Sequence, residues 1–330
     1  MNGSDATKYF DLIDRIASLD VGGRGMTPLY DAARARSGQP LCSAAARHLT
    51  DLHSGDSVML LTGSIVRGWV SLELGDSDGP IGTAALARTL NYGFNVVPVV
   101  LTDVSLMKSM SATLEAAGLT VVTADQARAA VLNKRFTAVA VVESCSTEDR
   151  AAEREARMLH DRYHPRVVIS IERAGLTADD TFRNSVGIDY SAGRSRLDYI
   201  VREAQAHAVP TIGIGDYGNE IGMGAIREAV EKHMPNGKTV CAQLATDVIF
   251  PTGVSNWGCY AIQAALAILT GRTELAHSAD LEHRLLAAAP QFGLIDGLSG
   301  KREATADDLP LTANMSVVSL LETVVQRACR

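Results

Sequence analysis

The sequence is poor in several features that would define a specialised class of protein. Only 5% of its 330 residues are aromatic, and its 31 lysines and arginines are outnumbered by 38 acidic residues. The resulting net charge of −7 and the lack of any concentrated basic stretch argue against a nucleic-acid partner and against a patch for membrane surfaces. The composition therefore gives no electrostatic sign of either kind of partner.

Cysteines are few and form no metal-binding or redox pair. The five cysteines are odd in number and scattered, with no CxxC spacing, which is typical of reduced thiols in a reducing compartment. No apolar run approaches the ~20 residues that span a bilayer. The longest, GCYAIQAALAIL at 258–269, contains Gln263 and predicts a buried core helix. The N-terminal stretch lacks the layout of a secretory signal, so we expect a cytoplasmic protein without a membrane partner.

Short apolar runs rich in β-branched residues recur along the chain and predict strands. They lie at 57–63, 95–101, 119–123, 137–143, 166–172, 209–215 and 246–251. Because these runs are almost continuously apolar, they indicate strands buried on both faces of a parallel sheet. Helix-period segments separate them, at 81–92, 104–117, 124–133, 148–163, 195–207, 220–234, 256–270 and 279–289. This alternation predicts an α/β fold with a mostly parallel, Rossmann-like sheet and helices on both faces.

No linker interrupts the chain, so we predict one α/β domain over residues 1–330. Residues 1–55 read as a helical N-terminal addition, with helices at 7–19 and 41–53 around the glycine-rich GGRG loop at 22–25. Residues 56–330 form the sheet core and the C-terminal helices, the last at 314–328. A homo-oligomer is compatible with this organisation.

Acidic side chains stand where the predicted strands end. Ligands of open α/β sheets bind at the carboxyl ends of the strands, and these ends carry Thr62-Gly63, Asp103, Glu143, Glu172-Arg173 and Asp216, with Asp78 in a separate loop. Aspartate is common in turns and helix caps, but glutamate is not. Converging carboxylates require a bound cation or a shared proton. Oxygen ligands alone favour Mn²⁺ or Mg²⁺ over zinc.

The stretch GIGDYGNEIGMG at 213–224 contains a GxGxxG pattern. A dinucleotide fingerprint belongs in the first strand-to-helix turn, whereas this one follows the sixth predicted strand. Asp216 and Glu220 would also repel phosphate. We therefore expect the glycines to leave space along the backbone around Asp216, Asn219 and Glu220. We expect no nicotinamide or flavin cofactor.

Two helix starts offer amides to an anion. GPIGTAALA at 79–87 places Pro80 at the first helical position, and GVSNWG at 253–258 offers Ser255 or Asn256 as the N-cap. Each could bind a substrate carboxylate, or could be ordinarily capped. Arg24 and Arg173 could clamp a carboxylate or be surface charges. His160 and His164 lie four residues apart without the glutamate of an HExxH motif, so a solvated helix end is expected there.

Six of these stretches, in this order, resemble the D-glutamate cyclase family. They are Thr62-Gly63, SDGPIGTAALA, LTD, IERAG, GDYGNEIGMG and SNWGCYAI, and the resemblance covers about residues 21–312. One departure is Tyr217, where the family usually has glycine, and a side chain there would line or narrow the pocket. The resemblance implies a hydro-lyase that condenses D-glutamate, or a close analogue, to 5-oxo-D-proline and water.

The resemblance and the strand ends together assign roles. Asp216 or Glu220 is the expected base, with Asn219 and Glu172 as further catalytic groups and Asp103, Glu143 and Asp216 as expected metal ligands. Substrate-binding residues are expected to be Thr62, Gly63, Asp78, Gly79, Gly82, Arg173, Tyr217, Ser255, Asn256 and Trp257. Two alternatives stay open: a hydrolase that opens a lactam or related ring, and a non-catalytic nucleotide-binding module.

Overall fold

The computed structural model describes residues 3–133 and 135–330, so Met1 and Asn2 of the predicted N-terminal addition lie outside the described residues. A seven-stranded sheet forms its centre, in the order β4-β5-β3-β1-β6-β7-β8, and each neighbouring pair is parallel. The strands are β1 Ser57–Leu61, β3 Val97–Thr102, β4 Thr120–Val121, β5 Val139–Ser144, β6 Val167–Ile171, β7 Thr211–Gly215 and β8 Val248–Pro251. The predicted α/β class and all seven predicted strands are confirmed.

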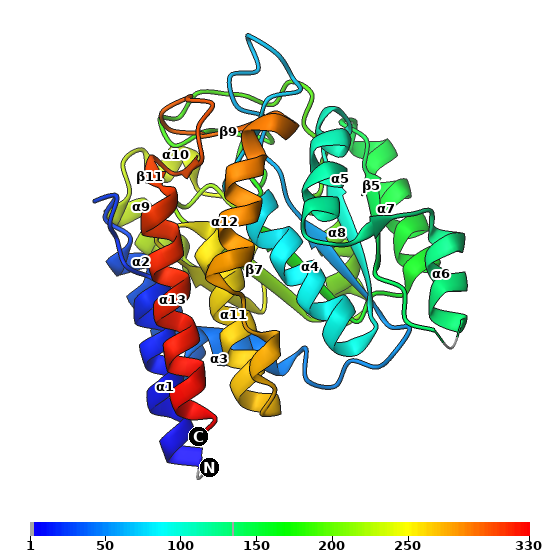
Figure 1. Ribbon diagram of the computed structural model, residues 1–330. Helices are drawn as coiled ribbons and strands as arrows, with labels where there is room; N and C mark the ends of the chain where they lie inside the picture. Colours follow the sequence, from blue (N-terminus) through cyan, green and yellow to red (C-terminus); the bar gives the residue numbers. More distant parts are fainter. Residues whose placement is uncertain (1–2, 134) are drawn as a thin grey trace.

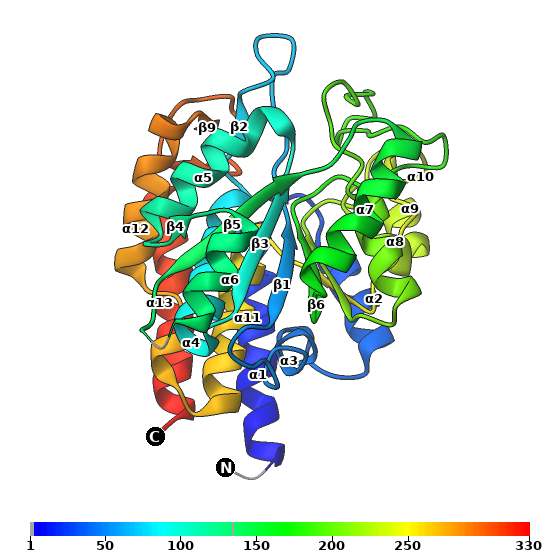
Figure 2. The same cartoon turned by 90° about the vertical axis from the view of Figure 1, so that its right-hand side faces the viewer.

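Helices cover both faces of this sheet (Figures 1 and 2). They are α1 Gly3–Ala17, α2 Thr27–Ser37, α3 Leu41–Arg47, α4 Pro80–Phe94, α5 Met107–Ala116, α6 Ala124–Leu132, α7 Asp149–Tyr163, α8 Asp198–Ala206, α9 Arg227–His233, α10 Gly237–Val240, α11 Ser255–Thr270, α12 Ala279–Ala288 and α13 Leu311–Ala328. Along β1, Val58 and Leu60 join one hydrophobic cluster and Met59 and Leu61 the other. This alternation explains the continuous apolar runs, because both faces of each strand are buried.

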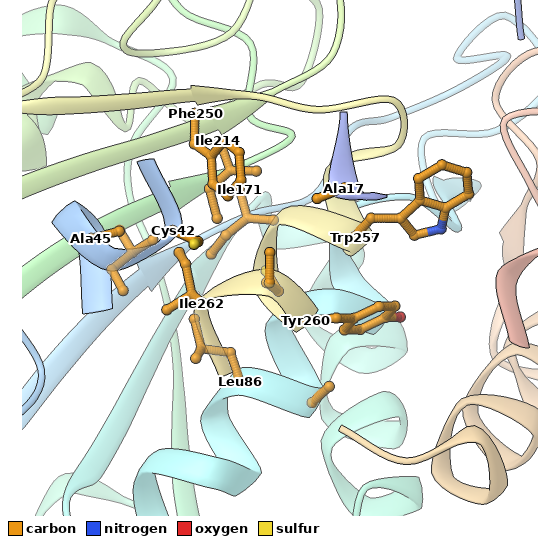
Figure 3. Close-up of a cluster of buried hydrophobic side chains, with 14 of the residues drawn as sticks. Ala17, Cys42, Ala45, Leu86, Ile171, Ile214, Phe250, Trp257, Tyr260 and Ile262 are labelled. Atoms are coloured by element: carbon orange, nitrogen blue, oxygen red, sulfur yellow. The ribbon is translucent and has the colours of Figure 1, made fainter. Parts of the chain in front are cut away.

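Helix α11 is the centre of the larger cluster. Fourteen of its 16 residues are buried, and α3, α4, α1 and α13 pack around it. Figure 3 shows Ile262 of α11 among Leu86, Cys42 and the strand residues Ile171 and Ile214. Figure 1 shows α1 and α13 side by side, so that the two ends of the described chain meet on this face.

Two predicted helices differ from the structure, and α2 and the short α10 were not predicted. The sequence reading missed α2, because only Leu29 and Ala33 of this helix are buried and its apolar pattern is weak. The helix expected at 41–53 ends at Arg47 and continues as turns. The helix expected from 220 begins with a short 3₁₀ turn at Gly224, because residues 220–223 form part of the turn after β7.

Two small sheets bring later segments back to the carboxyl edge of the main sheet. Strand β2 Gly75–Asp76 pairs with β9 Leu294–Ile295, and β10 Thr305–Ala306 pairs with β11 Leu309–Pro310. The main sheet has its switch point between β1 and β6, since the chain continues to β3 on one side and to β7 on the other. This is where open α/β sheets form ligand crevices. Within the described residues, no helix has both the length and the apolar character needed to cross a bilayer.

Candidate active site

Three carboxylates meet at the carboxyl edge of the sheet. One oxygen each from Asp78, Glu172 and Asp216 lies within 4.8 Å of the other two. Glu172 follows β6 and Asp216 follows the neighbouring strand β7. The chain after β6 then pairs with the turn after β7, where the Ile221 amide donates to the Arg173 carbonyl at 2.8 Å. This pairing holds the two strand ends against each other, so the predicted convergence holds for these three groups.

Glu172 has a backbone conformation that is rare for a residue with a side chain. Its φ of +47° lies in the left-handed region, which costs about 1–3 kcal/mol and is concentrated at functional sites. Its Oε2 accepts a hydrogen bond from the Ser255 hydroxyl at 2.5 Å. Gly79 allows this placement, because a Cβ on Gly79 would lie 2.8 Å from the Cβ of Glu172. The half-buried Glu172 is thus held in one orientation at the mouth of the cluster.

The starts of α4 and α11 cap each other. Asp78 accepts from the amides of Ser255 and Asn256, both at 2.8 Å, while Asn256 Oδ1 accepts from the amides of Gly79 at 3.0 Å and Gly82 at 2.6 Å. A Cβ on Gly82 would lie 2.8 Å from the Cα of Asn256, so this close approach requires glycine. The amides that were candidates for a substrate carboxylate are therefore bonded within the chain at Gly82, Ser255 and Asn256.

Glu220 closes the turn that follows β7. Its Oε1 accepts from the amides of Asp216 at 3.2 Å and Tyr217 at 2.9 Å, and its Oε2 accepts from Gly218 at 2.7 Å. Asn219 is turned to another loop, where its Nδ2 donates to the Arg183 carbonyl at 3.0 Å. The amides that a phosphate would need at 216–218 are thus taken by Glu220. Of the two candidates for the base, Asp216 faces the cluster, whereas the carboxylate of Glu220 accepts hydrogen bonds from backbone amides of its own turn.

Arg24 is a cation of the cluster, and it comes from the N-terminal addition. Its Nη2 lies 2.8 Å from Asp216 Oδ2 and 2.7 Å from Asp307 Oδ2, and it also donates to the Gly253 carbonyl at 2.6 Å. The GGRG loop is shaped by Asp20, whose carboxylate accepts from the Arg24 amide at 2.8 Å. Arg24 is therefore not a surface charge, and the carboxylates that it contacts belong to the protein itself. Sequence reasoning missed Asp307, because it follows none of the predicted strands.

Burial and mutual repulsion raise the pKa values of the clustered carboxyls. Burial raises the pKa of Asp216 to about 7, and the nearby Arg24 guanidinium opposes the rise. Burial followed by the charge of Asp216 raises the pKa of Glu172, and likewise that of Asp307, well above the ordinary range. Burial and then Asp307 raise the pKa of Asp76 to about 8. At neutral pH the cluster therefore holds protonated and ionised carboxyls side by side.

The structure does not bring Asp103 or Glu143 to this cluster. Both oxygens of Asp103 are bound at 2.8 Å by the guanidinium of Arg173, and both side chains are fully buried. Glu143 is the penultimate residue of β5, which lies four strands from β7, or about 19 Å at the usual strand spacing. There it accepts a hydrogen bond from Tyr163. The expected ligand set of Asp103, Glu143 and Asp216 thus cannot share one ion. Arg173 is likewise occupied and offers no free clamp.

The remaining expected binding residues are divided between the cluster and the core. The fully buried Thr62 hydroxyl has no hydrogen-bond partner among the described residues and lies beside Gly79, since a Cβ on Gly79 would come within 2.9 Å of it. The Gly63 carbonyl accepts from Arg173. Trp257 is buried in the core (Figure 3), and its Nε1 donates to Asn314 at 2.8 Å. Tyr217 reaches the Pro235 carbonyl at 3.5 Å.

Two hollows in the surface lie away from the carboxylate cluster. One of about 500 Å³ is lined by α2, α3 and the start of β8, and one of about 610 Å³ lies between α2 and α9. The cluster is the better candidate site, because the strained backbone of Glu172, the raised carboxyl pKa values and the switch-point position coincide there.

Comparison with known proteins identifies relatives of this chain. A family model described as D-glutamate cyclase-like, C-terminal, matches residues 13–322. The human protein D-glutamate cyclase, mitochondrial, is 36% identical over 103 residues. That alignment covers 31% of this chain and 17% of the human protein, far less than two thirds of the relative's length.

Proposed function

The chain belongs to the D-glutamate cyclase-like, C-terminal family, and on that premise we propose that it is a hydro-lyase that converts D-glutamate to 5-oxo-D-proline and water. One observation carries the proposal: oxygens of Asp78, Glu172 and Asp216 lie within 4.8 Å of each other at the switch point of the sheet. Such a cluster suits an amino acid, because it attracts an ammonium group and can exchange protons with it.

The reaction moves two protons from the ammonium nitrogen to the oxygen that leaves as water. Asp216, with a pKa of about 7, suits the role of base that takes the first proton. Glu172, whose pKa burial and Asp216 raise well above the ordinary range, stays protonated and donates to the departing oxygen. The nitrogen then attacks the γ-carbon, its second proton passes to Glu172, and protonated Asp216 supplies the second proton to the oxygen. Both groups return to their starting states.

Arg24, Asp307 and Asp78 position these two groups. Arg24 holds Asp216 and Asp307 at 2.8 and 2.7 Å, and a hydrogen bond from Asp307 restrains the rise in the pKa of Asp216. Asp78 fixes the start of α11 and so places the Ser255 hydroxyl on Glu172. These contacts hold the base and the acid close together, as a ring closure requires.

We propose Mg²⁺ or Mn²⁺ as the cofactor. Asp78, Glu172 and Asp216 would hold it in their ionised forms, since they offer oxygen ligands only, and the bound ion would then take the place of the Glu172 proton in activating the substrate. Such an ion supplies a Lewis acid that polarises the γ-carboxylate. We expect turnover to fall after treatment with a chelator and to return on adding Mn²⁺ or Mg²⁺. Full turnover in the chelated protein would contradict this part of the proposal.

The decisive experiment is an assay with both enantiomers of glutamate. We expect loss of one water from D-glutamate, measured by mass spectrometry, with L-glutamate as the matched control. The assay is repeated from 5-oxo-D-proline and from a panel of lactams, because a ring-opening hydrolase would use the same groups in reverse. The proposal fails if neither direction yields product from any acidic amino acid or its lactam. Turnover of another ring alone would favour the hydrolase.

A further inference from the structure

A second cluster of potential metal ligands lies at the opposite edge of the sheet. His160, Glu203 and His207 each place one nitrogen or oxygen within 4.8 Å of the other two. His160 lies in the last turn of α7, while Glu203 and His207 lie at the end of α8, and these helices pack side by side (Figure 2). At the end of α7, the Tyr163 carbonyl accepts from Ser57, the first residue of β1. The cluster therefore lies at the amino-terminal edge of the strands, away from the candidate active site.

The three side chains are at least partly buried, and Nδ1 of His207 lies 3.0 Å from the Glu203 carbonyl oxygen, a contact that a metal would replace. The exposed fractions are 13% for His160, 17% for Glu203 and 47% for His207. The Nδ1 of His160 is buried without a hydrogen-bond partner among the described residues, and the nearest carboxylate oxygen, on Asp161, is 3.8 Å away. A buried nitrogen without a partner costs free energy, and a bond to a metal would recover it.

The surrounding backbone favours a cation at this place. The negative ends of two helix dipoles meet here, because α7 ends at Tyr163 and α8 ends at Ala206. The carboxylate of Glu203 adds charge, with its Oε1 3.4 Å from Nδ1 of His207. The site thus combines two imidazoles with one carboxylate, whereas the cluster at the other edge offers only carboxylate oxygens.

From this geometry we propose that His160, Glu203 and His207 form a peripheral site for a transition-metal ion such as Zn²⁺ or Ni²⁺. Two imidazoles and one carboxylate are the ligands that these ions prefer, whereas Mg²⁺ and Mn²⁺ prefer oxygen. The ion joins α7 to α8, leaves a position for water, and acts independently of the proposed reaction.

Binding requires a modest rearrangement of the two rings. The rings are stacked, with centroids 4.0 Å apart and planes at 24°, whereas ligand atoms about 2.1 Å from a tetrahedral ion lie about 3.4 Å apart with their lone pairs converging. His207 is the group that turns, because nearly half of its side chain is exposed and histidine χ2 is broad. The well-packed His160 and Glu203 then keep their places.

The test is calorimetric titration of the untagged chain with Ni²⁺ alone. The reference protein carries Asp78→Asn and Asp216→Asn, which weakens binding at the carboxylate cluster. We expect one Ni²⁺ per chain, and His207→Gln should lower its affinity at least about tenfold. His164→Gln is the matched control, since its ring centroid lies 6.5 Å from that of His160 and outside the ligand set, and it should leave the affinity unchanged.

A melting experiment provides a second readout. Ni²⁺ should raise the Tm of the reference protein and of His164→Gln but not that of His207→Gln, because an ion bound only to the native state stabilises it. Equal titration curves for the reference protein and His207→Gln, or no saturable binding to either, would overturn the proposal.

Discussion

Glu172 and Asp216 follow neighbouring strands. Their environments suit Glu172 as a proton donor and Asp216 as a proton acceptor. Asp216 has a guanidinium within 2.8 Å, while Glu172 has a hydroxyl donor and the negative charge of Asp216 beside it. Carboxyl groups whose protonation differs in this way are the usual basis of paired acid and base catalysis. At the scale of the residue, the proposed function therefore depends on two side chains.

Asp216→Asn should lower kcat by about 10²- to 10⁴-fold, because an amide cannot accept the ammonium proton. In the unchanged protein, kcat should rise with pH through about 7 as Asp216 ionises. Asp125→Asn, an exposed aspartate on α6, is the control and should have no effect. A kcat for Asp216→Asn equal to that of the control would show that another group is the base.

Glu172→Gln should also lower kcat, since glutamine has no acidic proton to donate, while substrate binding is largely kept. The pH profile discriminates a proton donor from a structural group. In the unchanged protein, kcat should fall at alkaline pH as Glu172 ionises, because burial and Asp216 raise its pKa. This alkaline limb should disappear in Glu172→Gln. Its persistence would assign the limb to a different group.

At the scale of the element, the site depends on two helices that cap each other. Asp78 caps α11 and Asn256 caps α4, so the loops on either side of Glu172 are fixed by the same contacts that stabilise the helices. Capping and catalysis are thereby coupled, and a change in one cap should affect both stability and turnover.

Asn256→Ala tests this coupling. It should destabilise the protein by about 1–2 kcal/mol, as expected for a lost cap, and should also lower kcat, since the Gly79 amide beside Asp78 loses its contact with Asn256 Oδ1. Ser278→Ala is the matched control, because Ser278 caps α12 by accepting from the Leu281 amide and lies outside the cluster. It should cost similar stability in chemical denaturation and leave kcat intact. An equal effect of both changes on kcat would refute the coupling.

At the scale of the molecule, the site joins segments from the whole chain. Arg24 comes from the N-terminal addition, Asp216 from the sheet and Asp307 from the segment before α13. The packing of α1 against α13 holds the first and last of these segments together (Figure 1). The helical additions are therefore part of the site.

In Arg24→Ala, the rise of kcat with pH that reports ionisation of Asp216 (the acid limb of the profile) should occur at higher pH. The Arg24 guanidinium counteracts the burial that raises the pKa of Asp216, so its removal should raise that pKa further. The control is Arg34→Ala, which removes a partly exposed pair with Asp11 at 3.3 Å and should change stability by less than about 1 kcal/mol. An unshifted limb in Arg24→Ala would exclude the electrostatic role.

The buried acids also predict how stability depends on pH. Asp216 and Asp76 have folded-state pKa values of about 7 and about 8, raised by burial above their ordinary value. Such groups favour the folded state when protonated, so their contribution is complete below about pH 4 and is lost as pH rises through about 7 to 8. Calorimetry should show Tm falling between about pH 4 and about pH 8. Asp76→Asn, which keeps an oxygen acceptor, should flatten this fall, and a rising Tm would contradict the argument.

Local patterns in the sequence were enough to predict the sheet and its acidic edge. Continuous apolar runs indicate strands buried on both sides, and residues directly after such runs must lie at the carboxyl edge, as Glu172 and Asp216 do. The helix starts at Pro80 and Ser255 were also readable, because caps are local signals. The single-domain organisation and the roles of the site residues stay predictions.

Tertiary structure alone decided which of the aligned side chains meet. Asp103 follows its strand as Asp216 does, yet Arg173 neutralises it in the interior, and the order of the strands places Glu143 far from β7. Arg24 and Asp307 join the cluster although 283 positions separate them in the chain. The physical reason is that hydrophobic period and capping depend on near neighbours in sequence, whereas ion pairing and shared protons depend on distance in space, which only the packed fold determines.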